Sequence, residues 1–130
     1  MCSSDLATFT ALSGRIARSG SAVPQLMSAL DFRRATTKEI VIAGRPGASD
    51  TAALLRLVHD RFLPNKVLAL ADGGRGQVEL AEVVPFVEAM NMRDGKATIY
   101  VCENYVCRLP TNDLTVAARL LDARPTTQRP

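Results

Sequence analysis

The chain has few of the residues that mark several common classes of protein. Its 130 residues include no tryptophan, two tyrosines and four phenylalanines, so few rings could stack on nucleic-acid bases. The net charge is only +3, and the arginines are scattered, with Arg33 and Arg34 as the one adjacent pair and Lys38 nearby. A nucleic-acid reader concentrates such charge in a stripe, so we expect no nucleic-acid partner.

Long apolar runs and cysteines are also scarce. No apolar stretch approaches the roughly 20 residues that a membrane-spanning helix needs. The N-terminus, MCSSDLATFT, has neither the basic start nor the long apolar block of a secretory signal. Three cysteines are too few for a disulfide-rich secreted framework. We therefore expect no membrane contact and a location in the reducing cytoplasm.

The residues that are present indicate a globular protein with a helical start. Apolar residues make up 47% and charged residues 22% of the chain. Between residues 4 and 18, apolar residues recur at spacings of three and four, which predicts a helix. Ser19-Gly20-Ser21 ends it, and a second helix follows with Pro24 in its first turn. We expect a helical hairpin over residues 1–36, an α/β domain over 37–124 and a frayed tail over 125–130.

Short apolar segments alternate with helical spacing in the remainder of the chain. Strands are expected near residues 39–43, 66–70 and 97–102, with helices between them. A strand that is apolar on both faces is typical of a parallel sheet covered on both sides. We therefore predict an α/β fold with a small, three- to four-stranded, mostly parallel sheet and covering helices, preceded by the helical hairpin.

Each covering helix is expected to bury one side. The residues predicted to face the core are Leu54, Leu55, Val58 and Phe62, then Val83, Val84, Phe86, Val87 and Met90, and finally Val116, Ala117, Leu120 and Leu121. Pro85 is predicted to divide the middle helix, because proline removes a helical hydrogen bond.

The stretch Tyr100–Pro110, YVCENYVCRLP, is expected to form a buried strand, a tight turn and a short return strand. With residues 104–105 as the turn, Cys102 lies opposite Cys107 at a non-hydrogen-bonded position. The Cα atoms of such a pair lie about 4.5 Å apart, at the short end of what a disulfide bridges. The turn residues Asn-Tyr are a weaker turn signal than Asn-Gly.

Three interpretations of this cysteine pair stay open. The two thiols can be reduced, half-buried packing residues. They can form a reversible cross-strand disulfide. They can belong to a zinc site, which the C-x4-C spacing and the distant single histidine, His59, disfavour. We expect no metal and no catalytic set of residues, and we treat Cys102 and Cys107 as the candidate redox residues.

Two loops after strands are candidate ligand sites. The first contributes Gly44, Arg45, Gly47 and Ser49, and the second contributes Asp72 and Gly73. Loops at the carboxyl ends of strands in α/β sheets commonly bind small molecules or anions. Neither loop has the glycine pattern or the lysine of a nucleotide-binding motif, so a simple turn and helix cap is the alternative interpretation. No cofactor is predicted.

Several segments together resemble one known family. They are AVPQLMSALD (22–31), EIVIAG (39–44), FLPNKV (62–67), GKATIYVC (95–102) and NYVCRLP (104–110). Over about residues 4–121 they are similar to the C-terminal part of the large thioredoxin-domain proteins related to the spermatogenesis-associated thioredoxin-like protein. The specific elements are Y-V-C-x-N-x-x-C-x-x-P and F-L-P-N-K.

The resemblance implies a role within a larger protein. Members of the family resemble a thioredoxin-like domain followed by an α/α-barrel, and this chain contains neither the thioredoxin-like domain nor most of the barrel. It is thus expected to be a non-catalytic C-terminal domain or fragment whose partner is the rest of the parent polypeptide. The helical hairpin would be the end of the barrel, and its apolar surface would favour self-association when it stands alone. The alternatives are a thiol redox element and a small-molecule or anion site.

Overall fold

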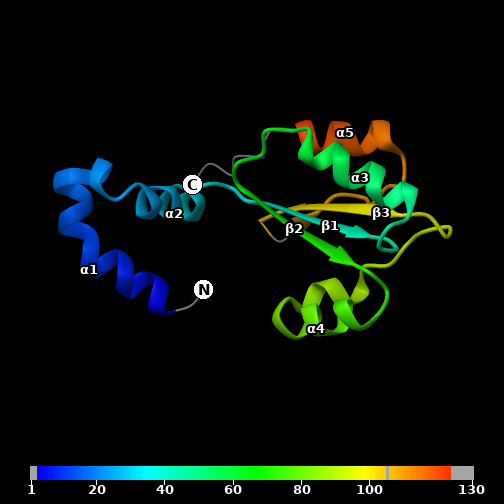
Figure 1. The fold of residues 1–130 in the computed structure, drawn as a ribbon, viewed down its shortest axis with the longest axis horizontal. Helices are drawn as coiled ribbons and strands as arrows, with labels where there is room; N and C mark the ends of the chain where they lie inside the picture. The colour runs from blue at the N-terminus through cyan, green and yellow to red at the C-terminus, as the bar shows by residue number, and fades with distance from the viewer. Residues whose placement is uncertain (1–2, 105, 124–130) are drawn as a thin grey trace. The chain divides into compact units, whose positions relative to one another are not determined.

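The computed structural model describes residues 3–104 and 106–123, and the predicted frayed tail lies outside the described residues. The chain divides into two compact units that meet between Thr36 and Thr37. No helix of the described ranges is long and apolar enough to cross a membrane. The elements of each unit are labelled in Figure 1.

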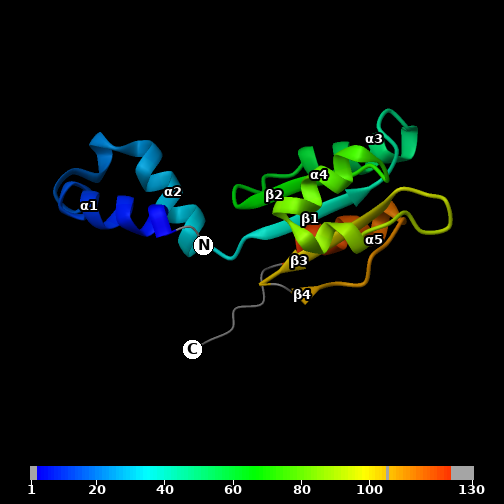
Figure 2. The ribbon, with the colours of Figure 1, turned by 90° about the horizontal axis from the view of Figure 1, so that it is seen from below.

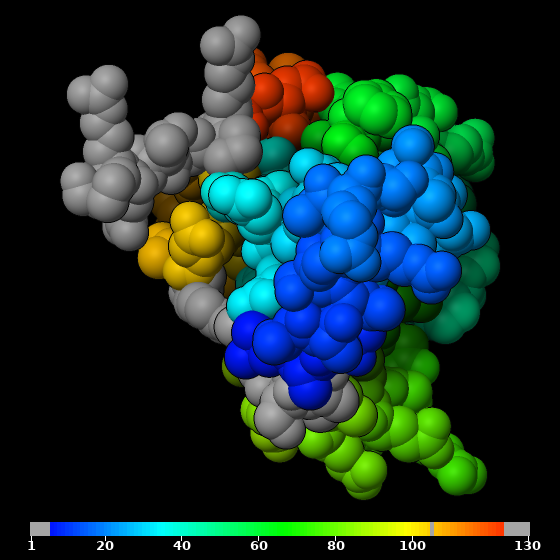
Figure 3. Space-filling model, turned by 90° about the vertical axis from the view of Figure 1, so that its left-hand side faces the viewer, coloured from blue at the N-terminus to red at the C-terminus, as the bar shows by residue number. Residues whose placement is uncertain are grey.

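The first unit consists of two helices. Helix α1 (Ser3–Ser19) and helix α2 (Pro24–Arg34) are joined by the 3-10 helix η1 (Gly20–Ala22), as the apolar spacing and the glycine predict. The guanidinium of Arg33 lies 5.7 Å from the centre of the Phe9 ring, which links the two helices by a cation–π contact. No side chain of residues 6–36 is buried, so the surface of this unit, coloured blue in Figure 3, retains partly exposed apolar groups.

The second unit contains a four-stranded sheet. Its strands are β1 (Lys38–Ala43), β2 (Lys66–Ala71), β3 (Thr98–Glu103) and β4 (Val106–Cys107), in the order β2-β1-β3-β4. The α/β class and the predicted strands are confirmed. The prediction of a mostly parallel sheet is wrong, because only β1 and β2 are parallel, while β3 is antiparallel to β1 and β4 to β3.

The strand direction follows from where the chain enters β3. Thr98, the first residue of β3, pairs with Ala43, the last residue of β1, so β3 must run back along β1. A tight turn at Asp94 and Gly95, both with positive φ, feeds the chain into β3 at that end. The apolar character of β1 comes from helices on both faces of the sheet and therefore says nothing about strand direction.

Helices cover both faces of the sheet, giving three layers (Figure 1). Helices α3 (Ser49–His59) and α5 (Leu114–Asp122) pack on one face, where Ile40, Ile42 and Ile99 form the centre of the core. Helix α4 (Arg75–Val83) and the 3-10 helix η2 (Pro85–Ala89) cover the other, and α4 lies in front of the sheet in Figure 2. The predicted division at Pro85 is confirmed.

Several apolar side chains that we predicted to face the core are exposed instead. They are Phe62 (92% exposed), Val83 (82%), Phe86 (43%) and Val116 (38%). Helix α3 ends at His59, so Phe62 lies beyond the helical face that would have buried it. Pro85 begins a 3-10 helix, whose tighter turn rotates Phe86 away from the sheet.

Candidate functional site

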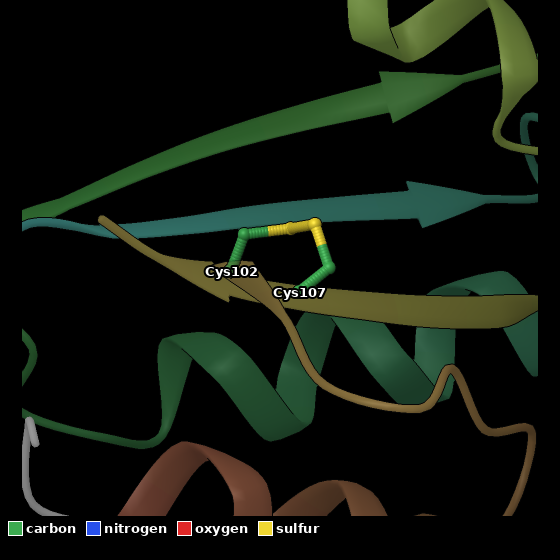
Figure 4. The surroundings of a disulfide bond; sticks show 2 residues. All are labelled: Cys102 and Cys107. Carbon is green, nitrogen blue, oxygen red and sulfur yellow. A yellow bond between two sulfur atoms is a disulfide. The ribbon is translucent and has the colours of Figure 1, made fainter. Parts of the chain in front are cut away.

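The two candidate redox cysteines are joined by a disulfide in the structure. Cys102 on β3 pairs with Cys107 on β4, the register that the sequence predicts, and the Cα atoms are 3.9 Å apart. The N–H of Arg108 donates to the carbonyl of Val101 at 2.9 Å, so the ladder hydrogen bonds flank the cysteine pair and leave it at a non-hydrogen-bonded position. Figure 4 shows the bridge spanning from one strand to the other.

A left-handed turn residue sets this register. Asn104 has φ of 52°, a conformation that asparagine adopts more readily than most residues and that the primed hairpin turns require. Tyr105, the second predicted turn residue, and Cys2, the third cysteine, lie outside the described residues. The local sequence therefore places the two sulfurs on the same face of the hairpin.

The surroundings of the two cysteines differ. Cys102 is 1% exposed and belongs to the apolar cluster between the sheet and the α4–η2 layer, together with Val41 and Val87. Cys107 is exposed, as is its neighbour Val106 on the edge strand. Strand β3 also pairs with β1 along its other edge, and there Glu39 is the cross-strand partner of Cys102.

The first candidate ligand loop connects β1 to α3. Gly44 is buried against α3, Arg45 and Gly47 are exposed, and Ser49 is the first residue of the helix after the capping position Ala48. The carboxylate of Asp50 accepts hydrogen bonds from the N–H groups of Ala97 and Thr51, both at 2.8 Å. These bonds hold the pKa of Asp50 below its ordinary value.

The second candidate ligand loop connects β2 to α4 and begins beside the first, since the N–H of Gly44 donates to the carbonyl of Ala71. The carboxylate of Asp72 accepts from the N–H groups of Gly74 (2.8 Å) and Gln77 (2.9 Å), which lowers the pKa of Asp72. In both loops a carboxylate already occupies backbone donors that an anion would need.

Gln77 is a residue whose importance the sequence does not reveal. It lies in the first turn of α4, which begins at Arg75, and it is only 7% exposed. Its amide nitrogen donates to the carbonyls of Val87 (2.8 Å) and Met90 (3.1 Å), and its oxygen accepts from the N–H of Gly73 (2.9 Å). The side chain thus ties the loop to the chain after η2.

A cleft of about 440 Å³ opens beside this network. It is lined by the loop glycines Gly73 and Gly74, by Val78 and Ala81 of α4, and by Glu88 among others. Within residues 3–104 and 106–123, no three histidine, cysteine or acidic side chains come together as metal ligands. The cleft therefore offers a concave surface next to Asp72 and Gly73, with two apolar side chains and the two carboxylates of Glu82 and Glu88.

A buried ion pair is a further feature that sequence reasoning missed. Lys38 at the start of β1 is 6% exposed, and its ammonium binds the carboxylate of Glu103 and the carbonyl of Ala123 at 2.8 Å. Lys38 and Glu103 are partners in the β1–β3 register. The pair ties the end of α5 to the sheet beside the turn of the cysteine hairpin.

Comparison with known proteins identifies relatives of this chain. Spermatogenesis-associated protein 20 of Rattus norvegicus is 41% identical over 112 residues, which are 86% of this chain and 14% of that protein. The chain is homologous to a segment of spermatogenesis-associated protein 20. The human protein of the same name is 41% identical and the mouse protein 40% identical over 112 residues. No family model matches the chain, and no solved structure does.

The homology defines the chain's relation to a longer polypeptide. The chain spans 14% of the length of these spermatogenesis-associated protein 20 relatives, so most of each relative has no counterpart in it. The predicted relation to the spermatogenesis-associated proteins is confirmed. Each of these relatives is a much longer protein, and this chain matches one segment of it.

Proposed function

We propose that this chain is a non-catalytic, C-terminal α/β domain that packs against the remainder of a large thioredoxin-like protein in the cytoplasm. The observation that carries the proposal is the amount of apolar surface left uncovered. Phe62, Val83 and Leu109 are 92%, 82% and 87% exposed, and the first unit buries no side chain of residues 6–36. Exposed apolar side chains mark an interaction site where they form a contiguous patch, and the proposal is that the parent protein covers them.

The rest of the parent polypeptide is the partner that fits this surface. The relatives are far longer than the 14% that this chain matches, and their remaining residues are available to cover it. From the family resemblance, these remaining residues would include a thioredoxin-like domain and an α/α-barrel, and these are the parts against which the chain would pack. When the chain stands alone, helices α1 and α2 would instead favour self-association.

Hydrogen exchange tests this proposal. In the isolated chain, the amides of α1 and α2 should exchange rapidly, because their helices rest on few tertiary contacts. In full-length rat spermatogenesis-associated protein 20, the matching helices should exchange at least about tenfold more slowly, since docking would raise their opening free energy. The amides of β1 are the internal control and should be equally protected in both proteins.

Two outcomes would contradict it. The first is equal exchange of the α1–α2 amides in the short chain and in the long protein. The second is turnover of a disulfide or sugar substrate by the isolated chain at enzyme-like rates.

A surface variant, Phe62→Ser, should lower binding of an apolar dye without changing the melting temperature, whereas Val87→Ser in the core should lower the melting temperature.

The disulfide favours a second candidate function, a reversible thiol redox element made of Cys102 and Cys107. Cytoplasmic disulfides in mesophiles are usually transient, so a bridge in that compartment would open and close with the thiol pool. The cross-strand Cα separation of 3.9 Å is below the usual range of disulfides. Titration of free thiols before and after mild oxidation is the test. Thiols that all persist after oxidation would count against this function.

A further inference from the structure

The Cys102–Cys107 bridge presents one accessible and one inaccessible end to a reagent. Cys102 is 1% exposed and packs in the apolar cluster beneath the α4–η2 layer, while Cys107 is exposed. Disulfide exchange requires a thiolate to reach the sulfur that it attacks. Only the Cys107 end meets that requirement in the folded chain.

The edge strand that carries Cys107 adds to this accessibility. Strand β4 has two residues, and Val106 before Cys107 and Leu109 two residues after it are 67% and 87% exposed. No described strand pairs with the other side of β4, because it ends the sheet. A small thiol can therefore approach Cys107 from solvent without displacing any core residue.

We propose that Cys107 is a site of S-thiolation by low-molecular-weight thiols such as glutathione, an inference that rests on the reversible bridge of the second candidate function. The thiolate of the small molecule attacks Cys107 Sγ and forms a new S–S bond. The Cys102–Cys107 bond breaks, and its electron pair leaves with Cys102 Sγ. That sulfur takes a proton from solvent, so the products are a mixed disulfide on Cys107 and a free thiol at Cys102.

The position of Cys102 makes the mixed disulfide persist. To close the bridge again, Cys102 must become a thiolate and expel the small thiol from Cys107. A thiolate at that position would be buried among apolar groups, where the charged form is disfavoured. It would also lie directly across the β1–β3 ladder from the carboxylate of Glu39, whose like charge opposes it further. The neutral thiol attacks poorly, so closure is slow. The same thiolate is the leaving group when the bridge opens, so the adduct also forms slowly and its yield depends on a high concentration of the small thiol.

Mass spectrometry of the full-length chain tests the site. The oxidised protein, carrying Cys2→Ser so that only the bridge cysteines remain, is incubated with millimolar glutathione and quenched with acid and an alkylating agent. We expect the glutathione adduct on Cys107 to exceed that on Cys102 by at least about tenfold, with Cys102 recovered as the alkylated thiol. An adduct mainly on Cys102, or shared equally, would overturn the proposal.

Two further outcomes separate this proposal from the function on which it rests. A bridge that yields neither free thiols nor adduct would refute the reversible element itself. Free thiols that appear without any adduct on Cys107 would refute only the S-thiolation site. Native-state alkylation gives an independent reading: Cys107 in the Cys102→Ser chain should react about tenfold faster than Cys102 in the Cys107→Ser chain, and equal rates would contradict the proposal.

Glu39→Gln is the matched variant for the persistence of the adduct. It removes the charge across from Cys102 and retains the size of the side chain, and Glu39 has no part in the bridge itself. After glutathione is removed, the adduct should decay several-fold faster in this variant than in the parent chain, because the Cys102 thiolate forms more readily. An unchanged decay rate would show that Glu39 has no such effect and would overturn this step.

Discussion

Replacing Gln77 by methionine should destabilise the second unit strongly although the residue lies at the start of a helix and next to a loop. Methionine has nearly the same length and volume, so the change removes hydrogen bonds without opening a large cavity. The bonds removed join the side chain to the carbonyls of Val87 and Met90 and to the N–H of Gly73. The carbonyl of Val87 keeps the N–H of Met90 as a donor, whereas the carbonyl of Met90 and the N–H of Gly73 lose the partner that Gln77 supplies.

The expected magnitude follows from the number of bonds. A net contribution of about 0.5–1.5 kcal/mol for each of three hydrogen bonds gives a loss of about 1.5–4.5 kcal/mol in the free energy of unfolding. The control is Val78→Met, one position further along α4, where the side chain is 65% exposed. That change should stay within about 0.5 kcal/mol of the parent chain. Urea denaturation followed by circular dichroism measures both.

Gln77→Glu sharpens the test because it keeps the shape and removes only the donor. A carboxylate would face the carbonyl oxygens of Val87 and Met90, so its folded-state pKa would lie above its unfolded value. The stability of this variant should therefore be highest at acidic pH and should fall as the pH rises through the folded pKa. The reasoning would be refuted by a Gln77→Met chain as stable as the parent, or by a Gln77→Glu chain whose stability relative to the parent does not change with pH.

Three more predictions concern packing, charge and pH. Gly44→Ala should cost about 1–3 kcal/mol, because the new methyl would clash with Oγ1 of Thr51, and the double variant with Thr51→Ala should recover most of that loss in thermal melts. Lys38→Met should cost about 3 kcal/mol by leaving the carboxylate of Glu103 buried without its partner, and replacing both partners by apolar residues should cost less, as a double-mutant cycle would reveal. Hydrogen bonds to the carboxylate of Asp50 lower its pKa in the folded state. Their contribution to stability is therefore complete at pH values above the unfolded pKa of about 3.9, and it is lost as the pH falls through the lower folded pKa. In the Asp50→Asn variant, the free energy of unfolding should fall less steeply between neutral and acidic pH than in the parent chain. An unchanged slope would contradict the lowered pKa of Asp50.

The cysteine hairpin was predictable because its determinants are local. The number of residues between Cys102 and Cys107, and the tolerance of Asn104 for a left-handed conformation, set the register of the hairpin. Once the register is set, alternation along the two strands brings both cysteines to one face. Neither the redox chemistry of the pair nor its partner follows from that local geometry.

The burial and the hydrogen-bond partners of several side chains were not predictable, because they depend on where helices end and on which distant segments pack together. Phe62 continues the apolar spacing of α3, yet the helix stops three residues earlier. Gln77 belongs to no motif in the sequence, yet its side chain donates to carbonyls ten and thirteen residues further along the chain. The partners in the Lys38–Glu103 pair are 65 residues apart, and only the β1–β3 register brings them together.

By itself, the sequence determined the kind and order of the elements, the break at Pro85 and the meeting of Cys102 with Cys107, because helix periodicity, proline and tight turns act over a few residues. Only the tertiary structure decided that β3 runs antiparallel to β1 and that one end of the disulfide is buried while the other is exposed. Strand direction and burial depend on which distant segments pack together. An apolar strand can pair in either direction, parallel or antiparallel, and bury its side chains equally well once helices cover both faces of the sheet.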